Sequence, residues 1–177
     1  MKKILILVGS NHSQSINKQL AEYAGHKLEG NQVDIVDLQN FDAPMYSIDI
    51  EKNQGHPEAI KSLYAQMQKY DAYIIVSPEH NGLMPAILKN TIDWLSRVGG
   101  KFLGNKPVAL LSTSPGATGG ANNLKVMSHL LPWWGGQVVD TFSLGSFNEK
   151  FDKELKVITD SIEDEKLDTL MKSLIAA

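Results

Sequence analysis

Five short apolar runs, interleaved with helical patterns, constrain the fold of this sequence more than any other feature. They occupy residues 4–8, 33–37, 72–77, 108–112 and 138–142. Most of them are rich in Val, Ile and Leu throughout, which is typical of strands covered on both faces of a sheet, whereas the run at 33–37 alternates and is expected nearer an edge. Strands that alternate with helices predict an α/β fold with a parallel sheet.

The segments between these runs carry apolar residues at helical spacing. Ser15 is a favourable residue to begin the first helix and Gly30 lies just beyond its end, while Pro57 suits the first turn of the second. Gly99 and Gly100 are expected to end the third helix. The predicted helices cover residues 15–29, about 57–67, 86–97, 121–131 and 149–174, the last as one helix or a pair.

Five strands with right-handed crossovers predict a doubly wound sheet. We expect a flavodoxin-like five-stranded parallel sheet of order 2-1-3-4-5 in three layers, α/β/α. The 177 residues suit one domain, covering 1–177. The stretch 38–55 exceeds a usual connecting loop, so we expect it to cover part of a site or a partner surface.

Composition excludes several classes of function. The 17 Lys and Arg residues are scattered among 20 Asp and Glu, so nucleic acid is not expected as a partner. The absence of cysteine removes disulfides, thiolate metal sites and cysteine nucleophiles, and redox chemistry would need a bound cofactor. His26, His56 and His129 show no metal-site spacing, and no apolar segment is long enough to span a bilayer. We therefore expect no metal, no membrane and a cytoplasmic location.

Ligands of doubly wound sheets bind beyond the carboxyl ends of the strands, where the strand order reverses. Three loops, 9–15, 78–85 and 113–120, should meet there. The first offers the hydroxyls of Ser10, Ser13 and Ser15 at a helix N-terminus, an arrangement that suits a monophosphate. The spacings of triphosphate and dinucleotide loops are not present. The alternative is that Ser15 only caps the helix.

The second loop follows a strand and places polar groups beside a turn. Pro78 stiffens it and Gly82 allows a sharp reversal, so backbone amides and the tips of Glu79, His80 and Asn81 could line a heterocycle. Leu83 and Met84 would stay exposed only if a ring system or another subunit covered them. The third loop is rich in small residues, which permit close approach of a flat or anionic ligand. A plain β-to-α turn is the alternative.

At these loops the sequence resembles the NADPH-dependent FMN reductase family, which includes chromate, quinone and azo-dye reductases of flavodoxin-like fold. The stretch SPEHNGLMPAILKNTIDWLSR, residues 77–97, carries most of the resemblance. The shorter stretches GSNHSQSIN at 9–17 and STSPG at 112–116, followed by Gly119 and Gly120, agree with it. The similarity extends to about Leu131.

The resemblance implies bound FMN, with NADPH or NADH as co-substrate. It implies that Ser10, Ser15 and Asn17 hold the phosphate, and that residues 78–82 and 112–116 flank the isoalloxazine. Three departures are His12 for an Arg, His80 for a Tyr and Leu83 for a small polar residue. The expected cofactor-binding residues are Ser10, His12, Ser15, Ile16, Asn17, Pro78, Glu79, His80, Asn81, Gly82, Ser112, Ser114, Pro115 and Gly116.

For His12 we hypothesise contact with the phosphate, and the alternative is an exposed loop histidine without a role. No side chain is assigned as a general acid or base, because the flavin carries the chemical step.

The implied activity is hydride transfer from NAD(P)H through FMN to a small acceptor such as a quinone, azo compound, metal oxyanion or free flavin. The alternative is a non-enzymatic electron carrier of flavodoxin type, although those are usually strongly acidic and this chain carries a formal charge of -3. A phospho-acceptor domain would need acidic residues where Gly9, Ser10 and Ser77 stand, and no G-x-S-x-G supports a serine hydrolase. We expect a homodimer or homotetramer.

Overall fold

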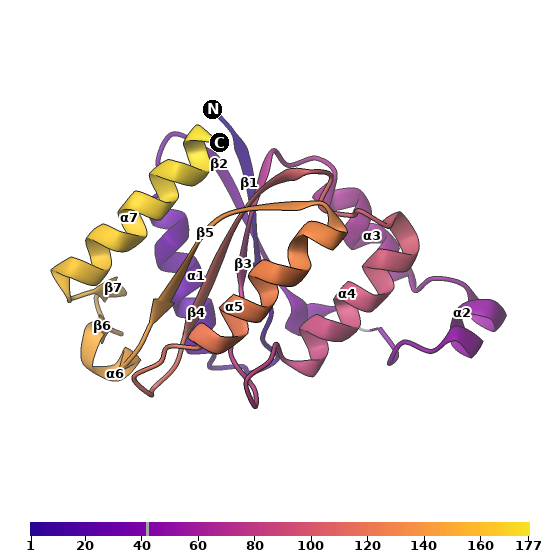
Figure 1. Ribbon diagram of the computed structural model, residues 1–177, viewed down its shortest axis with the longest axis horizontal. Helices are drawn as coiled ribbons and strands as arrows, with labels where there is room; N and C mark the ends of the chain where they lie inside the picture. Colours follow the sequence, from indigo (N-terminus) through magenta and orange to yellow (C-terminus); the bar gives the residue numbers. More distant parts are fainter. Residues whose placement is uncertain (42) are drawn as a thin grey trace.

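A five-stranded parallel sheet forms the centre of the protein (Figure 1). The structure, a computed structural model, describes residues 1–41 and 43–177. The strand order is β2-β1-β3-β4-β5, so the predicted order 2-1-3-4-5 and the flavodoxin-like class are confirmed. The strands are β1 Lys3–Val8, β2 Gln32–Asp37, β3 Ala72–Val76, β4 Lys106–Thr113 and β5 Gly136–Leu144.

Helices cover both faces of this sheet. The larger ones are α1 Ile16–His26, α3 Glu58–Met67, α4 Ala86–Gly99, α5 Ala121–Leu130 and α7 Ser161–Ala176. Alternate residues of β1 serve the two faces: Leu5 and Leu7 pack with α3, α4 and α5, while Ile4 and Ile6 pack with α1 and α7. Both faces of each central strand are therefore shielded from solvent, which explains why β1 and β3 are apolar almost throughout.

The segment 38–55 contains a short 3-10 helix, Leu38–Asn40, and helix α2, Ile48–Gln54, which projects at the right of Figure 1. None of the side chains of α2 is buried. Its neighbours are held by α4 instead: the amide oxygen of Asn90 accepts from Tyr46 N–H at 2.7 Å, and the Trp94 indole donates to the Pro44 carbonyl at 2.7 Å. Both of these hydrogen bonds join the segment to α4, while Leu38 at its start is buried in the core against the sheet.

A second fastening joins α2 to α4 through charge. The Arg97 guanidinium lies 3.0 Å from Glu51, which also accepts from the Tyr46 hydroxyl at 3.0 Å. The hydrogen bond from Arg97 holds the pKa of the Glu51 carboxyl below its ordinary value. The ionised carboxylate is thus the form that the folded protein favours.

The prediction of helix over 149–174 is wrong in its first part. After β5, the short helix α6, Phe147–Lys150, leads into an antiparallel pair, β6 Phe151–Asp152 and β7 Val157–Ile158. The Asp152 carboxylate accepts from the N–H groups of Glu154 and Leu155, and Lys156 adopts a φ of 56°. This turn reverses the chain, so a helix cannot continue through it.

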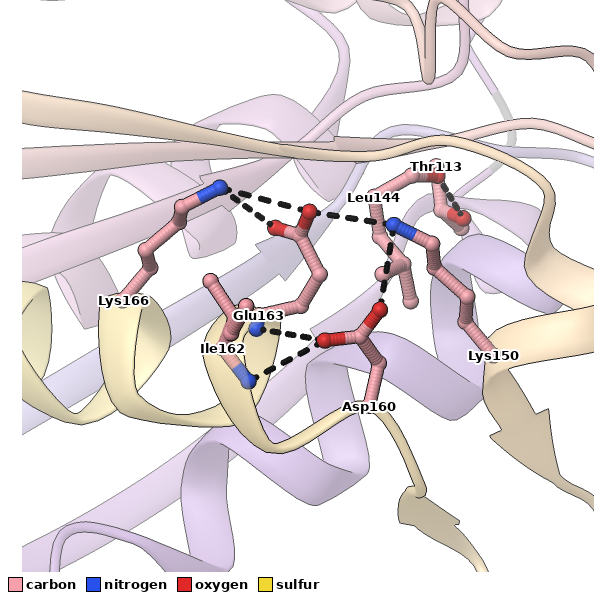
Figure 2. Close-up of polar contacts among 7 residues, drawn as sticks. All are labelled: Thr113, Leu144, Lys150, Asp160, Ile162, Glu163 and Lys166. Carbon is pink, nitrogen blue, oxygen red and sulfur yellow. Dashed lines mark hydrogen bonds and ion pairs between the residues drawn. The ribbon is translucent and has the colours of Figure 1, made fainter.

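Helix α7 begins only after this pair. The Asp160 carboxylate caps it by accepting from Ile162 N–H at 3.0 Å and Glu163 N–H at 3.2 Å, as Figure 2 shows. Lys150 approaches Asp160 at 3.4 Å and Glu163 at 3.1 Å, which joins α6 to the start of α7. Ile162, in the first turn of α7, is 66% exposed.

The sheet ends at β5, whose outer edge has no neighbouring strand among the described residues. Its pairing with β4 shifts between Val108 and Ala109, which leaves Val139 unpaired as a bulge. A bulge and an exposed charge, here Asp140, discourage the pairing of an edge strand with another chain. No helix in the described part of the chain is both long and apolar enough to cross a membrane.

Candidate functional site

Three loops meet at the carboxyl edge of the sheet and enclose a cavity of about 520 Å³. The loops follow β1, β3 and β4, the strands on either side of the point where strand order reverses. This volume lies within the range of about 300–1,000 Å³ that is usual for ligand sites. Its lining consists of Ser10, Asn11, His12, Gln14, Ser15, Ile16, Asn17, Pro78, Glu79, His80, Thr113, Ser114 and Pro115.

The first loop delivers the N-terminus of α1 to this cavity. Ser15 is the capping residue, and its hydroxyl accepts from Lys18 N–H at 3.2 Å. The N–H groups of Ile16 and Asn17 precede the first intrahelical hydrogen bond and so have no partner within the helix. Together with a partial charge of about +0.5 at the helix end, they make this corner favourable for an anion.

Ser10 and His12 shape the loop before α1. The Ser10 hydroxyl accepts from His12 N–H, and the Nδ1 of His12 accepts from Gln14 N–H, each at 3.2 Å. A ring nitrogen that accepts carries no hydrogen, so the neutral imidazole holds its hydrogen on Nε2. The side chain of His12 is exposed, and its Nε2–H can therefore donate to a ligand.

Asn17 connects the first loop to the third. Its Nδ2 donates to the Thr113 carbonyl and its Oδ1 accepts from Thr113 N–H, both at 3.0 Å. Asn17 is almost completely buried, and both ends of its amide are used by Thr113. Its backbone N–H and the second hydrogen of its Nδ2 are the donors left for a phosphate.

The second loop is a β-hairpin with a two-residue turn. His80 and Leu83 exchange two backbone hydrogen bonds, of 2.8 and 3.1 Å, around Asn81 and Gly82. The φ angles of these two central residues are 53° and 81°. Positive values at both positions define a type I′ turn, for which Asn-Gly is the preferred sequence.

The hairpin places its residues unequally. Pro78, Glu79 and His80 line the cavity, whereas Asn81 and Gly82 form the tip and are not among its lining residues. Leu83 is 55% exposed, but Met84 is only 9% exposed and packs into the core on the α4 side. Met84 therefore needs no ring system or second subunit to cover it, contrary to the expectation from sequence.

The third loop lines the cavity with Thr113, Ser114 and Pro115. Ser112 is fully buried beneath the loop, and its hydroxyl has no hydrogen-bond partner among the described residues. A Cβ at Gly120 would lie 2.0 Å from this hydroxyl, and Gly120 has a φ of +85°. Glycine is needed at 120 for both reasons, because a side chain would collide with Ser112 and would strain the backbone.

The structure brings together ten of the fourteen residues predicted to bind the cofactor. Four lie close by without lining the cavity: the hairpin tip Asn81 and Gly82, buried Ser112, and exposed Gly116. Asn11, Gln14 and Thr113 line it and were not predicted. Their positions inside the same loops, between predicted residues, are the signal that could have identified them.

A larger hollow of about 710 Å³ lies between the outer edge of β5 and α7. Glu163 in its lining is already paired with Lys150 at 3.1 Å and with Lys166 at 3.3 Å (Figure 2). None of the three predicted loops contributes to it. The smaller cavity therefore remains the candidate site, because it lies where the strand order reverses and the N-terminus of α1 forms part of its wall.

Comparison with known proteins gives a consistent result. The family model described as NADPH-dependent FMN reductase matches residues 2–149. The chain is 34% identical over 123 residues to a quinone reductase of Escherichia coli (strain K12), a match that covers 67% of this chain and 63% of that protein. It is 39% identical over 121 residues to a 2-hydroxy-1,4-benzoquinone reductase of Burkholderia sp, covering 67% and 64%. The matches thus span less than two thirds of these relatives.

Among solved structures, the flavoenzyme NAD(P)H:(acceptor) oxidoreductase FerB of Paracoccus denitrificans is similar over nearly the whole length. It superposes with a TM-score of 0.81 at 25% identity, covering 99% of this chain and 96% of that one. An NADH:FMN oxidoreductase superposes with a TM-score of 0.74 at 19% identity, covering 98% and 90%, which supports the fold.

Proposed function

The chain belongs to the NADPH-dependent FMN reductase family, and from this premise we propose that it binds FMN in the cavity of three loops and transfers electrons from NAD(P)H to a small acceptor. One observation carries the proposal. Three loops that are distant in sequence form a single cavity at the reversal of strand order, with a helix N-terminus in its wall. This is where doubly wound proteins bind phosphorylated cofactors.

The first loop fits the phosphate of FMN. The hydroxyls of Ser10 and Ser15 and the backbone N–H groups of Ile16 and Asn17 line the corner, and none of them adds negative charge. A monophosphate of charge about -1.5 to -2 gains from such donors and from the helix dipole. His12 would add a donor through Nε2.

The second and third loops fit the flavin ring. Pro78 and His80 on one side and Thr113, Ser114 and Pro115 on the other leave a space walled by rigid backbone. The reciprocal hydrogen bonds of Asn17 with Thr113 fix the distance between the phosphate corner and the third loop. A cavity that is preformed in this way orients a ring without a large ordering cost.

Bound FMN would supply hydride acceptance at N5 and the delivery of one or two electrons. The protein would hold the ring, restrict which face a nicotinamide or an acceptor reaches, and stabilise charge on the ring through backbone N–H groups. No side chain acts as a general acid or base in this proposal.

The names of the relatives support a quinone as the acceptor, because two of them are quinone reductases. Azo compounds, metal oxyanions and free flavin are further candidates. We also propose that the protein works in the cytoplasm, where NAD(P)H is regenerated, and that it assembles as a homodimer or homotetramer. Exposed Leu83, which pairs with the cavity-lining His80 across the hairpin, is a candidate for subunit contact.

Two measurements test the function. Titration of the FMN-free protein with FMN should give saturable binding and an absorption band at about 450 nm. NADPH or NADH oxidation should then require both bound FMN and a quinone, without any added reductase. A protein that binds FMN but oxidises neither nucleotide would be an electron carrier, and a protein that binds no FMN would refute the proposal.

A further inference from the structure

The carboxylate of Glu79 is directed at a helix end and not only at the cavity that it lines. Its Oε2 accepts from the backbone N–H of Asn123 at 3.0 Å, and its Oε1 lies 3.4 Å from the Nδ2 of Asn122. Both partners are in the first turn of α5. Gly120, at the capping position of α5, has no side chain to accept these N–H groups. Glu79 supplies the missing acceptor from 44 residues away.

The first turn of α5 holds the hairpin in return. The Asn123 amide donates to the Ser77 hydroxyl at 2.8 Å and to the Pro78 carbonyl at 3.0 Å, and Asn123 is fully buried. A Cβ at Gly120 would lie 3.5 Å from the Cβ of Glu79, so the two backbones are close at this point. The hairpin and α5 are thus interlocked by hydrogen bonds in both directions.

The negative charge of Glu79 also affects the electrostatics of the cavity wall. The N-terminus of α5 carries a partial positive charge, and the Glu79 carboxylate opposes it. With a neutral residue at 79, the helix end would leave net positive charge in this part of the cavity wall. A flavin gains negative charge when it is reduced, so a negative wall disfavours the reduced form.

We propose that Glu79 is a positioning residue that locks the hairpin of residues 77–83 onto α5 and keeps the reduction potential of a flavin in the cavity low. The interlock concerns the protein alone. The part on the potential rests on the proposed function.

Three variants separate the hydrogen bonds from the charge. Glu79→Gln keeps an oxygen that can accept from Asn123 N–H but removes the charge, whereas Glu79→Ala removes both. Glu165→Gln makes the same charge change on an exposed residue of α7 outside the cavity lining, and serves as the control.

The interlock is measured in FMN-free protein by amide hydrogen exchange. In Glu79→Ala, exchange at Asn123 N–H should rise about tenfold or more, since the amide loses a charged acceptor. In Glu79→Gln and in the control it should change less than about threefold. Unchanged protection in Glu79→Ala would overturn the interlock, whatever the protein binds.

The potential is measured from the affinities of each protein for oxidised and reduced FMN. In Glu79→Gln the ratio of reduced to oxidised affinity should rise about tenfold, equivalent to about 30 mV for a two-electron couple. The control should retain the wild-type ratio. If the wild-type protein binds FMN and Glu79→Gln leaves its ratio unchanged, the electrostatic role is wrong while the proposed function stands. If the wild-type protein binds no FMN, the function and the role in the potential fall together, and the exchange experiment still decides the interlock.

Discussion

Asn17 and Thr113, which are 96 residues apart, form a reciprocal pair: the side-chain amide of Asn17 donates to the backbone C=O of Thr113 and accepts from its N–H, both at 3.0 Å. This pairing joins the start of α1 to the end of β4 across the sheet. It holds the phosphate corner and the third loop in a fixed relation before any ligand arrives.

Replacement of Asn17 by Ala should therefore destabilise the FMN-free protein. Two buried backbone groups of Thr113 would lose their partners, at a cost of about 2 to 4 kcal/mol in the free energy of unfolding. Urea unfolding measures this loss. Ser112→Ala is the matched control, because the Ser112 hydroxyl is also buried but has no partner to lose within residues 1–41 and 43–177. Its unfolding free energy should fall by less than about 0.5 kcal/mol, or rise. Similar losses in both variants would contradict the role of the pairing.

Ser15 combines a cap with a proposed phosphate contact, and two substitutions separate these roles. Ser15→Ala should lower the unfolding free energy by about 1 kcal/mol, because Lys18 N–H loses its acceptor. It should also weaken FMN binding by about tenfold. Ser15→Asp restores a cap, so stability should return, but its charge should repel the phosphate and weaken FMN binding further.

Riboflavin provides the control for Ser15, since it has the ring without the phosphate. Its affinity, measured by quenching of flavin fluorescence, should be nearly the same in all three proteins. An equal loss of riboflavin binding in Ser15→Asp would place the effect on the ring and not on the phosphate.

His12→Ala tests whether the exposed imidazole contacts the phosphate. The Nε2–H is the free donor, so its removal should weaken FMN binding about three- to tenfold and leave riboflavin binding unchanged. His12→Asn, which retains a short polar side chain for the loop, distinguishes lost loop structure from lost donor. Wild-type affinity in His12→Ala would assign the histidine no role in binding.

The ionisation of Asp160 is expected to make the free energy of unfolding depend on pH in the acidic range. The hydrogen bonds from the start of α7, with Glu163 N–H first, and the neighbouring Lys150 hold the pKa of its carboxyl below the ordinary value of 3.8. A depressed folded-state pKa gives stability that is present above about pH 4 and is lost as pH falls through the lower, folded value. Asp160→Asn keeps the cap without the charge, so its stability should fall less on acidification.

The urea midpoints of wild type and Asp160→Asn, measured between about pH 6 and pH 2.5, should therefore converge at the acid end. Lys150→Met removes one cause of the depressed pKa and should reduce the convergence. A difference that stayed constant across this range would show that the charge of Asp160 contributes nothing.

Much of the fold could be predicted because its signals are local. The central strands β1, β3 and β4 are buried on both faces, so each appears as an apolar run, and the choice of strand order is narrowed by right-handed crossovers. The pair β6–β7 was missed for a physical reason. Phe151 and Ile158 are seven residues apart, a spacing that fits one face of a helix as well as two paired strands. Only the turn between them distinguishes the two structures.

The candidate site was predictable to the level of loops. Parallel strands end at one edge, so the three loops had to meet, and the Asn-Gly pair marks the hairpin turn directly. The direction of each side chain was not predictable. Asn17 is occupied by Thr113 and Glu79 reaches α5, and both partners are brought near only by the packing of helices on the sheet. No pattern within either loop encodes these contacts.

The side chains of Asn90 and Trp94 both donate to the Pro44 carbonyl, and these hydrogen bonds bear on which parts of the protein can change in sequence and length. The segment that contains α2 is secured to α4 through Asn90, Trp94 and Arg97, and none of the side chains of α2 is buried. A change in the length or sequence of that segment would therefore alter the surface near α2 and leave the packing of the helices on the sheet unchanged. The segment is the natural place for this scaffold to acquire new contacts without a change in its interior.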